Sequence, residues 1–168
     1  GDTVGAVAIL EQLCAQQQNW AAAHLELGLA LGRAGQGEAA LAPLRRAVKL
    51  KPDLPDAWRA LGDHLTIIGD RAGADDAYAQ SIKVSVRDPR LMQAAIALCE
   101  NRLAPAETLL REHLMQYPTD VAAIRMLAEV AARLKRYRDA ESLLERCLEL
   151  APSFSAARQN LALVLHRL

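Results

Sequence analysis

The sequence predicts an all-α protein, an α-solenoid of antiparallel helix pairs with about ten helices. Two observations support this fold class. Hydrophobic residues make up 52% of the chain but aromatic residues only 4%, and Ala and Leu dominate the apolar set. Ala and Leu are strong helix formers, whereas strands are rich in β-branched and aromatic residues. The second observation is a pattern of small and large apolar residues that repeats at intervals near 34 residues.

Small residues form the first ladder of this pattern. Gly28 and Gly62 lie 34 residues apart, and Ala95, Ala128 and Ala162 continue the ladder at steps of 33, 33 and 34 residues. Two helices approach closely only where a side chain is absent or is a single methyl group. We therefore expect these five residues to be contact points on the first helix of each pair.

A second ladder runs half a repeat out of phase with the first. Its members are alanines, each followed four residues later by a large apolar residue. The alanines are Ala6, Ala40, Ala74, Ala106 and Ala140, and the large residues are Leu10, Leu44, Tyr78, Leu110 and Leu144. Apolar residues at three- and four-residue steps indicate an amphipathic helix, so each period is predicted to hold a second helix that packs on the first.

These ladders predict the limits of each element along the chain. A lone second helix is expected at residues 4–18 and a lone first helix at 155–168. Between them lie four full repeats, at residues 21–54, 55–87, 88–120 and 121–154. The chain thus starts and stops within a repeat, which favours a segment of a longer protein.

Turn and capping residues mark the expected helix ends within these repeats. Gly35 and Gly69 follow first helices, where a left-handed residue commonly ends a helix. Asp70 is suited to cap the helix that comes next, and Asp88 precedes a proline suited to a first helical turn. At the starts of the last two first helices, the N-caps are predicted to be Thr119 and Ser153.

The residues of the second full repeat resemble a known family, the tetratricopeptide repeat. The stretch from Trp58 through Leu61-Gly62 to Leu65, followed by Ala74 and Tyr78, is similar to its signature, with Leu65 where Tyr is commonest. The resemblance implies a superhelix whose first helices line a concave groove that binds proteins or peptides. It also implies a scaffold or protein-binding module, with no catalytic residues in this chain.

A looser resemblance concerns residues 41–168. The stretches 47–58 and 86–93 resemble the repeat arm that precedes a sulfotransferase domain in certain bacterial fusion proteins. This implies a bacterial source and a catalytic domain beyond Leu168. The alternative function is then a regulatory or substrate-presenting arm of a larger enzyme.

Composition and spacing argue against several kinds of site. Twenty Lys and Arg balance twenty Asp and Glu, so the basic face that a nucleic-acid binder needs is not expected. The sequence shows no phosphate-binding glycine motif and no metal-ligand spacing among its four histidines and three cysteines, so we expect no cofactor and no metal. No apolar run is long enough to insert into a membrane. Three scattered cysteines suit a reducing, cytoplasmic location.

The family resemblance places the ligand site on the first helices. The predicted groove residues are Leu25, Leu29, Arg59, Asp63, Met92, Ile96, Arg125, Met126, Glu129, Arg133 and Asn160. Apolar members flanked by arginines favour a partner segment with apolar anchors and some acidic character. The competing interpretation is that two pairs four residues apart, Arg59 with Asp63 and Arg125 with Glu129, merely neutralise each other. A further alternative is a self-associating scaffold that forms a homo-oligomer through the apolar end, Leu161–Leu168.

Overall fold

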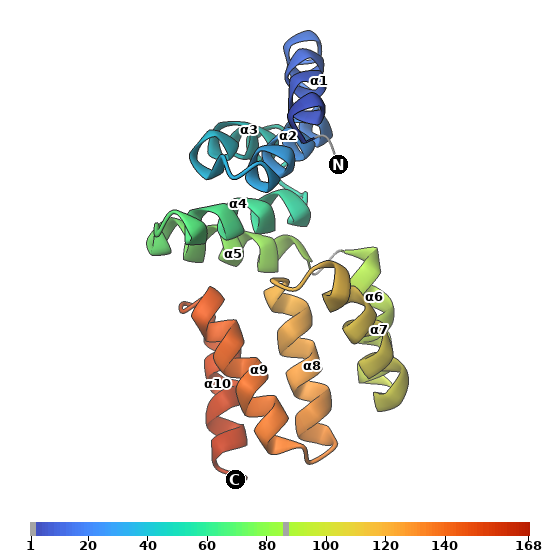
Figure 1. Ribbon diagram of the computed structural model, residues 1–168. Helices are drawn as coiled ribbons and strands as arrows, with labels where there is room; N and C mark the ends of the chain where they lie inside the picture. The colour runs from blue at the N-terminus through green and yellow to red at the C-terminus, as the bar shows by residue number, and fades with distance from the viewer. Residues whose placement is uncertain (1–2, 86–87) are drawn as a thin grey trace. The chain divides into compact units, whose positions relative to one another are not determined.

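The computed structural model describes residues 3–85 and 88–168, which form ten α-helices and no β-strand (Figure 1). The helices are α1 (Thr3–Gln16), α2 (Ala21–Arg33), α3 (Gly37–Leu50), α4 (Pro55–Ile67), α5 (Arg71–Ser85), α6 (Pro89–Cys99), α7 (Leu103–Gln116), α8 (Val121–Arg133), α9 (Tyr137–Leu150) and α10 (Ser155–Leu165). The predicted fold class is therefore confirmed. Residues 86 and 87, which end the second predicted repeat and begin the stretch 86–93, lie outside the described residues.

The chain divides into two compact units, an N-terminal unit of residues 1–81 and a C-terminal unit of residues 82–168. In the N-terminal unit α2 packs against α1, α3 and α4, and α3 also packs against α4. In the C-terminal unit α8 packs against α6, α7, α9 and α10. First helices are thus neighbours of one another in both units, α2 with α4 and α8 with both α6 and α10.

The predicted small-to-large contacts are present in the N-terminal unit. A Cβ atom added to Gly28 would lie 2.5 Å from Cγ of Leu44, and one added to Gly62 would lie 2.9 Å from the ring of Tyr78. Both partner side chains are fully buried. The glycines therefore let α2 approach α3, and α4 approach α5, more closely than any other residue allows.

In the C-terminal unit, alanine takes the place of these glycines. Ala128 and Ala140 are buried, as are the large residues Leu110 and Leu144. Ala6 and Ala162 differ from the prediction, because both are exposed. They lie on α1, which packs against α2, and on α10, which packs against α8 and α9.

The turns between paired helices use one backbone conformation at equivalent positions. Gly35 and Gly69 have φ of +75° and +85°, which confirms the predicted left-handed ends. At the same place in the next two repeats stand Asn101 and Lys135, with φ of 56° and 60°. Non-glycine residues rarely adopt this conformation, because the Cβ atom then approaches the following carbonyl oxygen.

Two of the predicted caps are confirmed and two are wrong. The Asp70 carboxylate accepts a hydrogen bond from the Gly73 amide at 2.9 Å, and Asp88 accepts one from the Arg90 amide at 2.9 Å. The N-cap of α8 is Asp120, not Thr119, and it accepts from the amides of Ala122 and Ala123. The N-cap of α10 is Phe154, not Ser153. A carboxylate next to the first turn satisfies two amides at once, so Asp120 is the stronger cap.

Candidate ligand-binding groove

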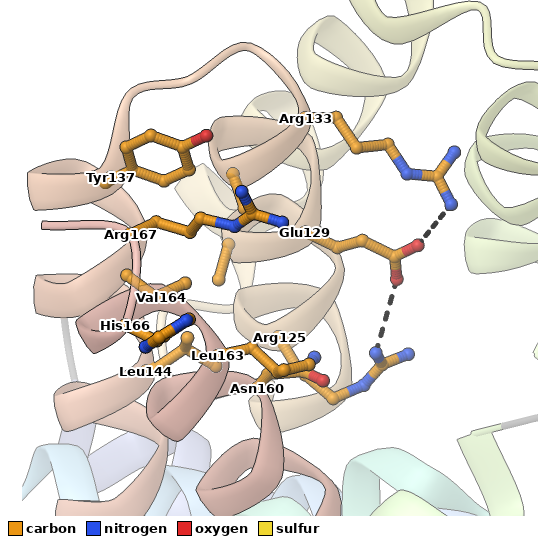
Figure 2. A pocket seen from close by; sticks show the side chains of 12 residues that line it. Arg125, Glu129, Arg133, Tyr137, Leu144, Asn160, Leu163, Val164, His166 and Arg167 are labelled. Carbon is orange, nitrogen blue, oxygen red and sulfur yellow. Dashed lines mark hydrogen bonds and ion pairs between the residues drawn. The ribbon is translucent and has the colours of Figure 1, made fainter.

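A cavity of about 640 Å³ lies in the C-terminal unit, and its lining side chains are shown in Figure 2. Its lining residues come from α8, α9, α10 and the few residues that follow α10. They are Arg125, Ala128, Glu129, Ala132, Arg133, Tyr137, Leu144, Asn160, Leu163, Val164, His166 and Arg167. We call this cavity the α8–α10 groove.

Charged residues at four-residue spacing form the α8 side of the groove. Glu129 accepts from Arg125 at 3.4 Å and from Arg133 at 2.5 Å, so one carboxylate lies between two guanidinium groups (Figure 2). The pairing of Arg125 with Glu129 that the sequence spacing predicted is thus present. Side chains four residues apart lie on the same helix face, which explains why all three meet.

Arg133 has a second, structural role. Its Nη1 donates to the carbonyl oxygen of Leu98 at 2.7 Å, near the C-terminus of α6. Carbonyl groups in the last turn of a helix lack partners within the helix, and a cation there is favourable. Arg133 is therefore held by both α6 and Glu129, whereas among the described residues the Arg125 side chain hydrogen-bonds only to Glu129.

The α10 side of the groove carries polar groups without partners. Asn160, Leu163 and Arg167 follow one another at steps of three and four residues, and His166 lies beside them (Figure 2). Within residues 3–85 and 88–168, the side chains of Asn160, His166 and Arg167 make no hydrogen bond or ion pair. Amide, imidazole and guanidinium groups that line one cavity can donate to a ligand in place of water.

Apolar side chains form the remaining surface of the groove. Ala128, Leu144 and Val164 are buried and line its inner side, while Leu163 is 68% exposed. A Leu side chain that becomes buried on binding contributes roughly 1.5–3 kcal/mol from the hydrophobic effect. The groove therefore combines one strong apolar anchor point with several donors.

Four of the predicted groove residues line this cavity: Arg125, Glu129, Arg133 and Asn160. Met92 and Ile96 are exposed on α6 but do not line it. Met126 is only 8% exposed and belongs to the apolar core of the C-terminal unit. As a groove contact Met126 stays a prediction, with little of its side chain open to a ligand.

The other predicted residues belong to the N-terminal unit. Leu25 is also only 8% exposed and Leu29 is half-buried, and their place in an apolar groove stays a prediction. Arg59 pairs with Asp56 at 2.9 Å, and Asp63 accepts from the Tyr78 hydroxyl at 2.7 Å. These two charged groups stabilise α4 and its contact with α5.

The sequence-based choice missed Arg167 and Tyr137, which also line the groove. A signal for Arg167 was present, since it lies four residues after Leu163 and seven after Asn160, on one helical face. Tyr137 begins α9 after a short turn, and its position depends on how α9 packs against α8. No spacing rule could have identified it.

The cysteines show how burial limits reactivity. Cys147 is fully buried and donates to the Val121 carbonyl oxygen at 3.6 Å, and desolvation raises the pKa of its thiol to about 12. This environment is that of a structural thiol and not of a nucleophile. Burial also raises the pKa of the Cys14 thiol, whereas Cys99 is exposed. In the described ranges no three His, Cys, Asp or Glu side chains gather closely enough to hold a metal ion.

Of the helices in the described part of the chain, none has both the length and the apolar character that crossing a bilayer requires.

Comparison with known proteins supports one family. The tetratricopeptide repeat model matches residues 21–64 and 121–164, together just over half of the 168 residues. The crystal structure of MamA superposes with a TM-score of 0.54 at 19% identity, covering 99% of this chain and 78% of that one. The TPR domain of P58(IPK) gives a TM-score of 0.50 at 18% identity, covering 99% and 51%. No curated protein is similar enough in sequence to count as a relative. The repeat model, which agrees with the helix pairs and with the spacing of Gly28 and Ala128, shows that this chain belongs to the tetratricopeptide repeat family.

Proposed function

We propose that this chain is a protein-interaction module that binds a segment of a partner protein in the α8–α10 groove. The observation that carries the proposal is the set of side chains around one cavity. An exposed leucine, Leu163, lies beside three polar side chains that have no partner among the described residues, Asn160, His166 and Arg167. Polar groups that stay hydrated until a ligand arrives give orientation, and the leucine gives affinity.

The groove is bounded by two first helices, which the family resemblance identifies as the ligand-binding face. An extended or helical segment fits between α8 and α10 if it places an apolar side chain against Leu163. Backbone or side-chain oxygens of that segment then accept from Asn160 and Arg167. The module needs no chemical step for this function.

The test is a selection of binding peptides from a displayed random library against the whole chain. The selected peptides are then measured against Leu163→Asp and against a matched control, Met115→Asp. Met115 is 84% exposed on α7 and does not line the groove. Both substitutions place a charge at an exposed apolar site, so each changes the free energy of unfolding by under about 0.5 kcal/mol.

We expect Leu163→Asp to weaken binding at least about tenfold while Met115→Asp leaves it unchanged, because only Leu163 loses buried area with the ligand. Circular dichroism checks that both variants keep the helical content of the parent chain. Peptides that bind all three proteins equally would overturn the proposal.

Self-association is a second candidate function, favoured by the apolar surface of α10. Leu165 and Leu168 are 51% and 58% exposed and do not line the α8–α10 groove. An apolar surface of this kind can pack against the same surface or a different one on a second copy. Sedimentation equilibrium would detect it as a mass that rises with concentration and falls back to that of one chain for Leu165→Lys. A single-chain mass at every concentration would exclude it.

The role as an arm of a larger enzyme stays a prediction from the sequence resemblance. It adds a catalytic domain outside these residues and does not alter the proposed groove.

A further inference from the structure

We infer that Glu129 is a built-in competitor for the partner, and that an acidic side chain of the partner displaces it from Arg125. This inference rests on the proposed binding of a segment in the α8–α10 groove. It assigns the chemistry of that segment and identifies Glu129 as the residue that sets its affinity.

The charges of the groove favour an acidic occupant. Three arginines and one glutamate line it, a net charge of +2 with His166 neutral. The whole chain, by contrast, has a formal net charge of zero. A concave surface of one sign attracts segments of the opposite sign, and guanidinium groups bind carboxylates through two parallel hydrogen bonds.

The two arginines next to Glu129 are held unequally. Arg133 donates to Glu129 at 2.5 Å and to the Leu98 carbonyl at 2.7 Å, so both of its terminal nitrogens are engaged. Arg125 reaches Glu129 only at 3.4 Å, longer than the usual range for an N–H···O hydrogen bond. Its side chain is about one quarter exposed, at 27%. Arg125 is therefore the guanidinium that an incoming carboxylate can take over.

Glu129 can give up Arg125 without losing its charge partner. When a ligand carboxylate binds Arg125, the Glu129 carboxylate keeps its short contact with Arg133. The helix α8 and its contact with α6 then remain as they are. Asn160 and Arg167 supply further donors from the opposite side of the groove. The ligand site consists of Arg125, Asn160 and Arg167, whereas Arg133 serves the packing of α6 on α8.

This arrangement predicts an unusual sign for one substitution. Glu129→Gln removes the competing carboxylate and the like-charge repulsion that an acidic ligand meets, so affinity rises roughly three- to tenfold. Arg125→Gln removes the receiving group, and affinity falls by about tenfold or more. Salt screens both charges, so the preference for an acidic ligand weakens as ionic strength rises.

The experiment uses the whole chain and the peptides selected through their dependence on Leu163. Each peptide is compared with a version in which every Asp and Glu is replaced by Asn and Gln. Affinities are measured for the parent chain, Glu129→Gln, Arg125→Gln and a control, Glu145→Gln. Glu145 is an exposed carboxylate on α9 that does not line the groove.

We expect the acidic peptides to bind Glu129→Gln more tightly and Glu145→Gln within about twofold of the parent chain. The amide versions should bind weakly and lose their sensitivity to position 129. If the amide versions bind as well as the acidic ones, or if Glu129→Gln weakens binding, the inference fails while the proposed function stands. If no peptide depends on Leu163, the proposed function fails and the inference fails with it.

Discussion

In the N-terminal unit the first helix of a pair meets the second through glycine, whereas in the C-terminal unit alanine takes that position. Leu44 lies where a side chain at Gly28 would be, but the buried Leu144 belongs to a repeat that has a methyl group at Ala128. Glycine inside a helix costs roughly 1 kcal/mol relative to alanine. The N-terminal unit thus offsets weaker helices with closer packing, and the C-terminal unit keeps the stronger helix former.

The two units also differ in the residues at their turns and helix N-caps. The N-terminal unit uses glycine at its two left-handed positions, Gly35 and Gly69, while the C-terminal unit holds Asn101 and Lys135 there. The C-terminal unit compensates with aspartate N-caps at α6 and α8, whereas no side chain caps α2 or α4. The same repeat can therefore be stabilised at its contacts or at its helix ends, and substitutions can exchange one for the other.

The largest expected effect on the free energy of unfolding comes from alanine substitutions at the packing partners Gly28 and Leu44. Leu44→Ala should lower the free energy of unfolding by about 2–5 kcal/mol, because it leaves a cavity. Gly28→Ala should cost about 1–2 kcal/mol, because overpacking against Leu44 exceeds the gain in helix propensity. The double variant should lose about 1–2 kcal/mol less than the two costs combined, since the new methyl group fills part of the cavity. Urea unfolding followed by circular dichroism measures all three.

The C-terminal unit provides the mirror experiment. Ala128→Gly added to Leu144→Ala removes a second buried apolar group from the same repeat, so it should deepen the loss and not relieve it. Additive costs at Gly28 and Leu44 would contradict the proposed difference between the units.

A smaller effect is expected at the buried cap of the C-terminal unit. Asp120 accepts from two amides of α8 and lies 2.8 Å from Nε2 of the buried His113. Asp120→Ala should cost about 2–3 kcal/mol, because it leaves an imidazole nitrogen and two amides without partners. Asp53, in the corresponding loop of the N-terminal unit, is exposed, and Asp53→Ala should change the free energy of unfolding by under about 0.5 kcal/mol. Equal losses of stability for Asp120→Ala and Asp53→Ala would show that the Asp120 cap does not distinguish the two units.

The next effect depends on pH. Burial acts to raise the pKa of Asp88, but hydrogen bonds from Arg90 outweigh it, so the pKa lies below its ordinary value. Its contribution is therefore present at neutral pH and is lost as the pH falls through the folded-state pKa. Arg90→Gln should cost about 1–2 kcal/mol at neutral pH and flatten the acid side of the curve of stability against pH.

Arg102→Gln is the matched control for Arg90→Gln. Arg102 also pairs with an acid two residues earlier, Glu100, but both side chains are more than half exposed. Water screens such a pair, so the variant should stay within about 0.5 kcal/mol of the parent chain and keep its pH dependence. An unchanged dependence of stability on pH for Arg90→Gln would show that Arg90 is not what lowers the pKa of Asp88.

The smallest effect is expected at the left-handed turns. Lys135→Gly removes an unfavourable contact of Cβ with the backbone and should stabilise the C-terminal unit by about 0.5–1 kcal/mol. Gly35→Lys introduces that contact into the N-terminal unit and should destabilise it by a similar amount. Thermal unfolding of the two variants and the parent chain shows whether each substitution raises or lowers stability. A loss of stability for Lys135→Gly would mean that the lysine side chain makes a compensating contact.

The sequence alone determined the helix pairs of the fold and some of the helix ends. Helix packing requires a small residue opposite a large one at a fixed spacing. The fold could therefore be predicted from two such pairs, Gly28 with Leu44 and Gly62 with Tyr78. Gly35, Gly69 and Asp70 act through neighbours a few residues away, which is why they could be predicted as well.

Only the tertiary structure decided which groove residues are available to a ligand. Leu25 and Met126 occupy predicted groove positions but are buried by neighbouring helices, and Arg133 is engaged by a carbonyl 35 residues away. Glu129 of α8 and Arg167, which follows α10, both line the α8–α10 groove, although α9 lies between them in the sequence. The exposure and the hydrogen bonds of a side chain depend on residues distant in the sequence, whereas helix spacing depends on residues within one turn.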